Sequence, residues 1–526
     1  MKPVRLISEA LTVGVWTLAS RVLGFVRDIL IAAWLGTGPV AEAFLIAFSL
    51  PNMFRRFFAE GAFNMAFVPL FSKKLEAGDE AEDFARNAFA WLALVLIGLT
   101  ILATIFMPWL VLAMASGFLG DARLDMAVTL GRVIFVYILF ISLAALVSGV
   151  LNASGRFKAA AAAPVLLNVI LIGALLFAES GLLPVSIINA PGGEGVHGTF
   201  LAFGVVIAGI GQLALVWIAA RTAGFNLMPT RPVLTPDMKR LAIIAAPAAL
   251  AGGVVQINLL VGRQVASFYD GAIAWLSYAD RLYQLPLGVV GIAIGIVLLP
   301  DLSRRLQAED TEGGQDALSR ATEISLAFSV PATVALIVIP ATIIGALFER
   351  GAFGPEDTQA TALATAIYAL GLPAFILQKV IQPLYFARED THRPFRFALV
   401  AMVVNAGLAI GLATWLEYIA AAVAVTVAGW TMLALLWWGS RSMGQAAVLD
   451  DRCRNRIWRI ILASVAMGVF LWGADLFLHP FAATGGLEIA ALFGLVISGM
   501  AVYAASGLLI GAFQLDELKS ALRRQR

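Results

Sequence analysis

Residues 88–110 read AFAWLALVLIGLTILATIFMPWL, a stretch without a charged side chain. A helix that crosses the hydrocarbon core of a membrane needs about 20 mostly apolar residues, so this stretch is long enough to cross. Similar stretches recur along the 526 residues, of which 60% are hydrophobic and only 13% charged. This composition excludes a cytosolic enzyme, a secreted domain and a disordered chain, and it indicates a polytopic membrane protein.

The apolar stretches, separated by polar or Gly/Pro segments, predict an all-α polytopic membrane protein with about 14 transmembrane helices. We place the spans at residues 8–34, 40–71, 87–115, 124–152, 159–178, 199–220, 241–267, 272–299, 318–347, 358–386, 395–415, 418–439, 457–477 and 487–511. The segments between the spans are too short to form a separate domain.

Positive charge is distributed unevenly between the two sides of the predicted bundle. Nearly all loop lysines and arginines lie on the side that holds both termini, and the other side holds only Arg123 and Arg350. Because positively charged loops are retained inside the cell, we expect both termini to be cytoplasmic. A net charge of +2 suggests no nucleic-acid partner, and the single cysteine, Cys453, supports neither a disulfide nor a metal cluster.

The chain contains an internal repeat of six spans. The sequence PLFSKKL at residues 69–75 closes the second span, and PDLSRRL at residues 300–306 closes the eighth. Asn168 follows an arginine by twelve residues, and so does Asn405. The distance along the chain between these two asparagines is similar to that between PLFSKKL and PDLSRRL. Because each copy has an even number of spans, both copies start on the same side of the membrane and are therefore parallel. A ligand site is expected at their interface.

This repeat predicts the domain organisation. We expect an N-lobe at residues 1–225 with transmembrane helices 1–6, and a C-lobe at residues 226–445 with helices 7–12. Residues 446–526 then contain helices 13–14, outside the repeat, and a cytoplasmic tail.

Eight basic residues lie within the predicted spans, where an arginine costs at least about 2.5–3.5 kcal/mol and therefore should face protein or water. They are Arg21, Arg27, Arg55, Arg56, Arg132, Arg263, Arg281 and Lys379. Arg132, Arg263 and Lys379 are close enough to a surface to snorkel. Glu60 follows Arg56 by four residues, the spacing of a structural ion pair within a helix.

The remaining arginines, from spans 1, 2 and 8, predict a site for an anionic headgroup. Guanidinium groups present forked donors that match phosphate and carboxylate oxygens. Asp28, Glu42 and Asp280 are also at membrane depth. An alternative is that the arginines pair with these carboxylates only to hold the bundle together.

Three stretches carry a family resemblance. Residues 20–28 read SRVLGFVRD, residues 50–63 read LPNMFRRFFAEGAF, and residues 347–353 read LFERGAF. The chain closely resembles the MurJ (MviN) family, the bacterial lipid II flippases of the MOP exporter superfamily. The resemblance covers nearly the whole chain.

The resemblance implies a flippase that moves lipid II from the cytoplasmic to the periplasmic leaflet by alternating access. It implies that residues of a central cavity bind the pyrophosphate–sugar headgroup, and that spans 13 and 14 form a groove for the polyprenyl tail. The implied substrate-binding residues are Arg21, Arg27, Arg55, Arg281, Asp28 and Glu42. Another MOP transporter, either a multidrug/cation antiporter or a polysaccharide-lipid flippase, is the alternative.

The implied partners are lipid II, an undecaprenyl-pyrophosphate-linked disaccharide pentapeptide, and membrane lipids. We expect no enzymatic activity, no cofactor, no metal and no nucleic-acid partner, and a protein that functions as a monomer. The expected location is the bacterial cytoplasmic (inner) membrane.

Overall fold

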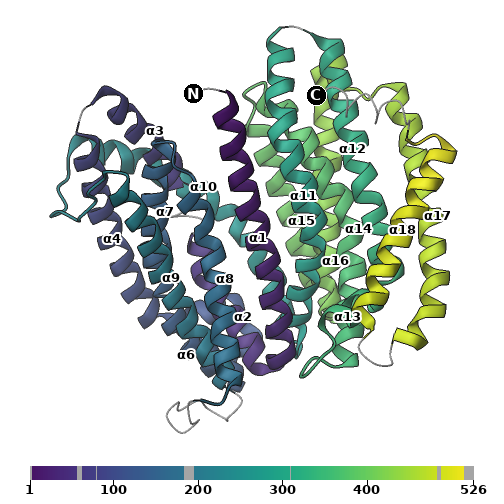
Figure 1. Ribbon diagram of the computed structural model, residues 1–526, viewed down its shortest axis with the longest axis horizontal. Helices are drawn as coiled ribbons and strands as arrows, with labels where there is room; N and C mark the ends of the chain where they lie inside the picture. The colour runs from purple at the N-terminus through teal and green to yellow at the C-terminus, as the bar shows by residue number, and fades with distance from the viewer. Residues whose placement is uncertain are drawn as a thin grey trace. The chain divides into compact units, whose positions relative to one another are not determined.

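The computed structural model describes residues 3–55, 62–78, 80–182, 195–308, 310–482 and 487–513. Within these ranges the chain is helical and contains no β-strand (Figure 1). Ten described helical segments are long and apolar enough to cross a membrane. The prediction of an all-α polytopic membrane protein is therefore confirmed. The total of 14 spans stays a prediction, and the other four predicted spans coincide with helices α1, α2–α3, α10 and α11.

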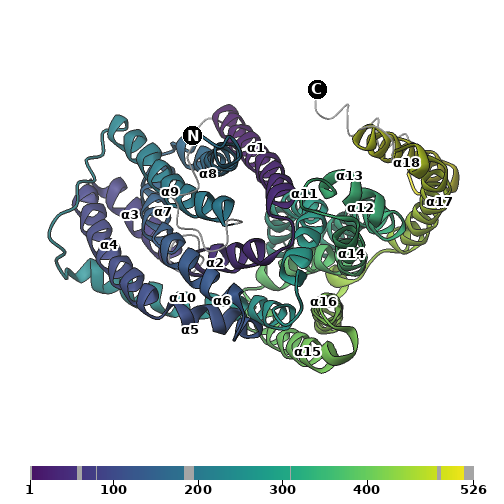
Figure 2. The same ribbon diagram turned by 90° about the horizontal axis from the view of Figure 1, so that it is seen from below.

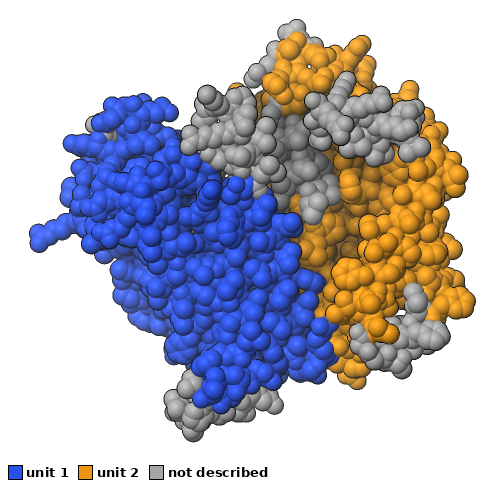
Figure 3. All heavy atoms as spheres, in the orientation of Figure 1, with its two compact units in different colours: residues 1–274, 350–353 blue, residues 275–349, 354–526 orange. Residues whose placement is uncertain are grey.

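The chain forms two compact units, which Figure 3 colours separately. Unit 1 comprises residues 1–274 together with the short segment 350–353. Its helices are α1 (Pro3–Leu35), α2 (Pro39–Arg55), α3 (Ala62–Ala77), α4 (Ala81–Ile105), α5 (Met107–Met114), η2 (Ser116–Phe118), α6 (Ala122–Ile134), α7 (Tyr137–Ala153), α8 (Lys158–Glu179), α9 (Val196–Thr222) and α10 (Pro236–Ala266). Within it, α1 packs against α8, α2 against α6, and α10 against α3.

Unit 2 comprises residues 275–349 and 354–526. Its helices are α11 (Ala272–Gln307), α12 (Thr311–Val338), α13 (Pro340–Phe348), α14 (Pro355–Phe386), α15 (His392–Leu416), α16 (Ile419–Ser440), η4 (Arg441–Met443), η5 (Gln445–Ala447), α17 (Asp451–Ala482) and α18 (Glu488–Ile510). The predicted lobes are defined by the sequence repeat, whereas the two units are defined by contacts within the folded chain. Helix α10, which we predicted in the C-lobe, belongs to unit 1. The predicted lobe limits stay a prediction.

The third span of each six-helix repeat is broken at a corresponding place. In the first repeat, α4 ends and α5 begins at Phe106, just before Pro108. In the second, α12 ends and α13 begins at Ile339, just before Pro340. Proline has no backbone N–H to donate and its ring clashes with the preceding turn, so it interrupts a helix but is well suited to the first turn of the next one. The matching breaks add structural support to the repeat.

Helices α17 and α18 lie side by side at the edge of unit 2 (Figures 1 and 2). They pack on α12 and α13 through a buried apolar cluster that includes Ile339, Leu471 and Leu495. Two polar contacts accompany this packing. The Tyr503 hydroxyl donates to the Ala327 carbonyl at 2.8 Å, and the Thr342 hydroxyl donates to Asp475 at 2.6 Å.

Candidate functional site

Arg27 is held in a hydrogen-bonded cluster between α1 and α8. Its Nε and Nη2 donate to one carboxylate oxygen of Asp28, at 2.9 and 2.6 Å, and its Nη1 donates to Asn168 Oδ1 at 3.0 Å. The amide of Asn168 in turn donates to the Ser20 carbonyl at 2.9 Å. A Cβ at Gly24 would meet this amide at 3.5 Å, an ordinary van der Waals contact, so α1 and α8 are close here. The cluster joins the two helices at one of the predicted site arginines.

Burial separates the predicted arginines. Arg27 and Asp28 are only 5% and 7% exposed, which is possible because the charges neutralise each other. Arg21, six residues earlier on α1, is exposed, and Arg55 at the end of α2 is half-buried. Arg281 on α11 of unit 2 is exposed. Unit 1 thus contains three of the four predicted arginines and unit 2 the fourth, and their convergence on one headgroup stays a prediction.

Glu42 is part of a second charged cluster in unit 1. Its carboxylate is 1% exposed and accepts from Arg123 Nη1 at 2.8 Å and from the Ile273 N–H at 3.1 Å. Arg123 also pairs with Asp121 at 2.5 Å and with Asp270 at 2.9 Å. Its guanidinium lies 4.6 Å from the centroid of a phenylalanine ring, a cation–π distance. Arg123 therefore connects α2, the start of α6 and the turn before α11.

Asp121 shows how this cluster also stabilises a helix terminus. It is the N-cap of α6, and its Oδ1 accepts from the Arg123 N–H at 3.0 Å. Partial desolvation raises the pKa of Asp121, but the hydrogen bonds and the positive charge of Arg123 together outweigh it and lower that pKa below its usual value. The carboxylate therefore stays ionised, the form that suits a helix N-terminus.

Sequence reasoning missed Arg123 as a site residue and counted it only as an outer-loop charge. One signal was available, because Arg123 is one of two basic residues on a side otherwise depleted of them. Its partners are distant in sequence and could not be read from spacing. Arg56 and Glu60, the predicted structural ion pair, lie outside the described residues.

The residues predicted to snorkel differ in their surroundings. Arg132 is exposed and its Nε donates to the Thr104 carbonyl at 3.3 Å. Lys379 is exposed, whereas Arg263 is partly buried. The exposure of Arg132 and Lys379 fits long side chains that extend along the protein surface.

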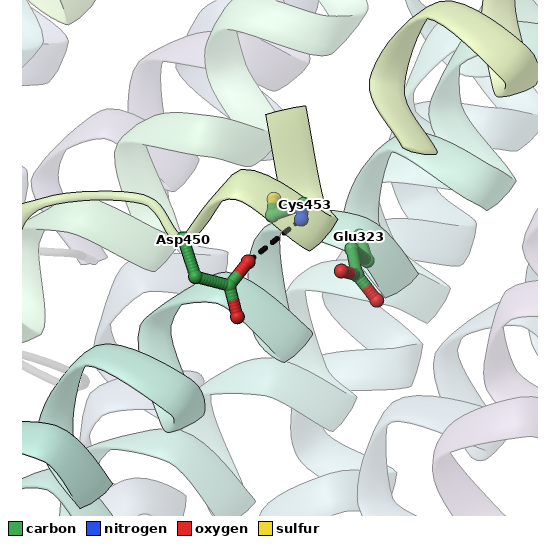
Figure 4. Close-up of side chains that lie close together, drawn as sticks. All are labelled: Glu323, Asp450 and Cys453. Carbon is green, nitrogen blue, oxygen red and sulfur yellow. Dashed lines mark hydrogen bonds between the residues drawn. The ribbon is translucent and has the colours of Figure 1, made fainter. Parts of the chain in front are cut away.

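One group of side chains in unit 2 has the composition of a metal site (Figure 4). Ligand atoms of Glu323, Asp450 and Cys453 lie within 4.8 Å of one another. Asp450, however, caps α17 by accepting from the Cys453 N–H at 2.6 Å, and Glu323 pairs with Arg456 at 3.0 Å and with Arg452 at 3.2 Å. Because two arginines already compensate the carboxylates, we interpret the group as an ion-pair joint between α12 and α17.

Unit 1 also contains an apolar pocket of about 780 Å³. It is lined mainly by α6, α8 and α9, with Phe177, Phe200 and Phe203 among its residues. None of the predicted site residues that the structure describes lines it. Its lining suits a hydrocarbon group and not a charged headgroup.

The fold is shared with solved multi-pass transporters. A solved inward-facing multidrug transporter of the MATE family in the MOP superfamily matches 81% of this chain and 95% of its own, with a TM-score of 0.63 and 14% identity. A solved lipid II flippase MurJ in an inward closed conformation matches 95% of this chain and 98% of its own, with a TM-score of 0.77 and 25% identity.

Sequence comparison then gives the family. The sequence profile of the lipid II flippase MurJ family matches residues 31–492. A probable lipid II flippase MurJ of Rhizobium meliloti (strain 1021) is 43% identical, over 99% of this chain and 96% of its own length. The chain belongs to the MurJ family of lipid II flippases, which are transporters.

Proposed function

We propose that this protein moves lipid II from the cytoplasmic to the periplasmic leaflet of the bacterial inner membrane by alternating access. The match to the lipid II flippase MurJ family over residues 31–492 carries this proposal. The helical, apolar architecture supports it, because a large polar headgroup needs a protein path through the hydrocarbon core. Both termini are proposed to be cytoplasmic, and the protein to act as a monomer without a nucleic-acid partner or an enzymatic step.

The proposed headgroup site consists of arginines from both units. We propose that Arg21, Arg55 and Arg281 act as direct ligands of pyrophosphate oxygens, because a guanidinium fork matches phosphate oxygens and these side chains are exposed or half-buried. Arg27 would act in the same site, and its bonds to Asp28 and Asn168 would orient it or be exchanged for the headgroup. Asp28 and Glu42 would act through their arginine partners.

The test is to replace the lipid II flippase of a bacterium with this protein. Cells depleted of their own flippase should grow when they express it, and lipid II should become accessible to an enzyme added outside. A chain present at normal membrane levels that does not restore growth would contradict the proposal. Export of cationic drugs without restored growth would instead indicate a multidrug/cation antiporter.

A further inference from the structure

The segment 350–353 belongs to unit 1, although α13 before it and α14 after it belong to unit 2. Its Ala352 N–H donates to the carbonyl of Ala33, in the last turn of α1, at 2.8 Å. The last four carbonyls of a helix have no partner within that helix. A residue more than 300 positions away in the sequence therefore supplies a partner for the end of α1.

Two glycines make this contact close. Gly36, just after α1, has φ +61°, and a Cβ there would lie 2.6 Å from the Ala352 oxygen. Gly351 also has φ +61°, and a Cβ there would overlap the Ala33 oxygen. Any other residue at either position would meet both backbone strain and a collision with main-chain atoms, which cannot rotate away. We call this contact between residues 33–36 and 350–353 the α1 clasp.

The two ends of the loop are fixed within unit 2. Glu349 accepts from the Thr358 hydroxyl at 2.6 Å. One oxygen of Asp357 accepts from the Gly354 N–H at 2.9 Å, and the other accepts from the Trp275 indole N–H at 2.8 Å. Only four residues, 350–353, therefore separate these two anchored ends, and the residue that bonds to α1 is one of the four. Such a short segment leaves little slack for movement of either anchor.

We propose that the α1 clasp is a releasable latch, closed in the state described and open when lipid II leaves on the outer side. The proposal rests on the alternating access proposed above. If α13 and α14 move away from α1 during alternating access, a connection this short cannot follow and keep its bond to α1, so the bond would break and re-form in each cycle. It also gives a role to Gly351 of the LFERGAF stretch at residues 347–353, which the headgroup site does not use.

A reversible cross-link tests whether release is needed. The Ala33→Cys/Ala352→Cys pair is made in a Cys453→Ala background and oxidised in membranes, with each single variant as a control. We expect efficient cross-linking, loss of lipid II access to an external cleaving enzyme, and recovery after reduction. Absence of the cross-link, or full cross-linking with transport unchanged, would overturn the proposal.

Glycine substitutions combined with the cysteine pair test the geometry of the same clasp. Gly351→Ala in the cysteine pair should slow cross-linking roughly five- to tenfold, because it costs strain and a collision. Gly354→Ala is the matched control, since a Cβ at Gly354 meets only Asp357 at 4.0 Å. Gly36→Ala compares with Gly120→Ala, where φ is +83° but the space is open. Equal cross-linking rates in Gly351→Ala and Gly354→Ala would refute the clasp.

The two readouts separate this proposal from the proposed function. Cross-linking yield reports the clasp itself and needs no transport. If the wild-type chain fails to restore flippase-depleted cells while the cysteine pair still cross-links, the proposed function fails and the clasp stands as a contact without a latch role. If the wild type restores growth and Gly351→Ala transports like Gly354→Ala, the latch fails alone.

Discussion

Arg27 and Arg123 are both buried cations, but their surroundings assign them different roles. The charge of Arg27 is compensated by the adjacent Asp28, and its guanidinium also donates to Asn168. Arg123 compensates the distant Glu42, and breaking such a pair leaves an uncompensated buried charge. Arg27 and Asp28 could be recognised together in the sequence because they are adjacent, whereas the contact of Arg27 with Asn168 on α8 depends on folding. The Arg123 cluster could not be recognised, because only folding brings α2, α6 and the turn before α11 together.

The direct ligands proposed for the headgroup should depend on guanidinium shape as well as charge. Arg→Lys at Arg21, Arg55 or Arg281 keeps the charge but loses the planar fork. Losing one charge-assisted hydrogen bond costs about 1.5–3 kcal/mol, so we expect about tenfold slower flipping or worse, and a larger loss for Arg→Ala. The measurement is growth and external lipid II access in flippase-depleted cells, with membrane levels determined by immunoblot.

Arg132→Ala is the control for this series, because that side chain is exposed and its Nε donates to the Thr104 carbonyl, away from the proposed headgroup ligands. It should support near-normal growth. Normal growth of all three alanine variants of the ligand arginines, at normal membrane levels, would argue against the headgroup site. Their disappearance from the membrane would favour a structural role.

The Arg123 cluster predicts a stability effect. Arg123→Ala leaves Glu42 buried without its cation and should destabilise the protein by about 3–5 kcal/mol. Asp270→Asn is the control, since the Asp270 side chain is 93% exposed and exposed pairs contribute only about 0–1 kcal/mol. Thermal unfolding of the purified proteins in detergent compares them. Equal midpoints for Arg123→Ala and the wild type would show that the pair adds nothing to stability.

At the scale of the elements, the predicted spans coincide with helices, because an apolar stretch in a membrane must satisfy its backbone internally. The breaks inside the spans were not predicted. Pro108 and Pro340 offered a signal for two of them, but proline is tolerated within membrane helices. The grouping of α10 with unit 1 could not be predicted from the sequence either, because it depends on contacts between α10 and α3 that hydropathy does not reveal.

The joint between α12 and α17 predicts non-additive mutations. Arg456→Met should destabilise unit 2, because Glu323 is 7% exposed and loses one of its two cations. The double variant Glu323→Leu/Arg456→Met should recover much of the loss, since apolar pairs often replace buried ion pairs without cost. Reaction of the buried Cys453 with a thiol-reactive fluorophore during heating reports the joint directly. A double variant as unstable as the sum of its single variants would contradict this interpretation.

For the whole molecule, the distribution of loop charge predicts which surface faces the cytoplasm. Single cysteines in a Cys453→Ala background can be labelled in intact cells with an impermeant maleimide. Leu119→Cys should react, because Leu119 is 73% exposed on the predicted outer side. Arg454→Cys should react only after the cells are opened, although the Arg454 side chain is 62% exposed. Reaction at position 454 in intact cells would invert the proposed topology.

The matching breaks at Phe106 and Ile339 bear on how this architecture arose. A helix interruption at one place in both halves is most simply inherited from a single ancestral gene that already had it before duplication and fusion. A six-span ancestor has both ends on one side of the membrane, so two copies insert in the same orientation. Fusing them needed only a linker and no inversion. The ancestor is thus expected to have worked as a parallel homodimer, and residues that now differ between the halves record the loss of that symmetry.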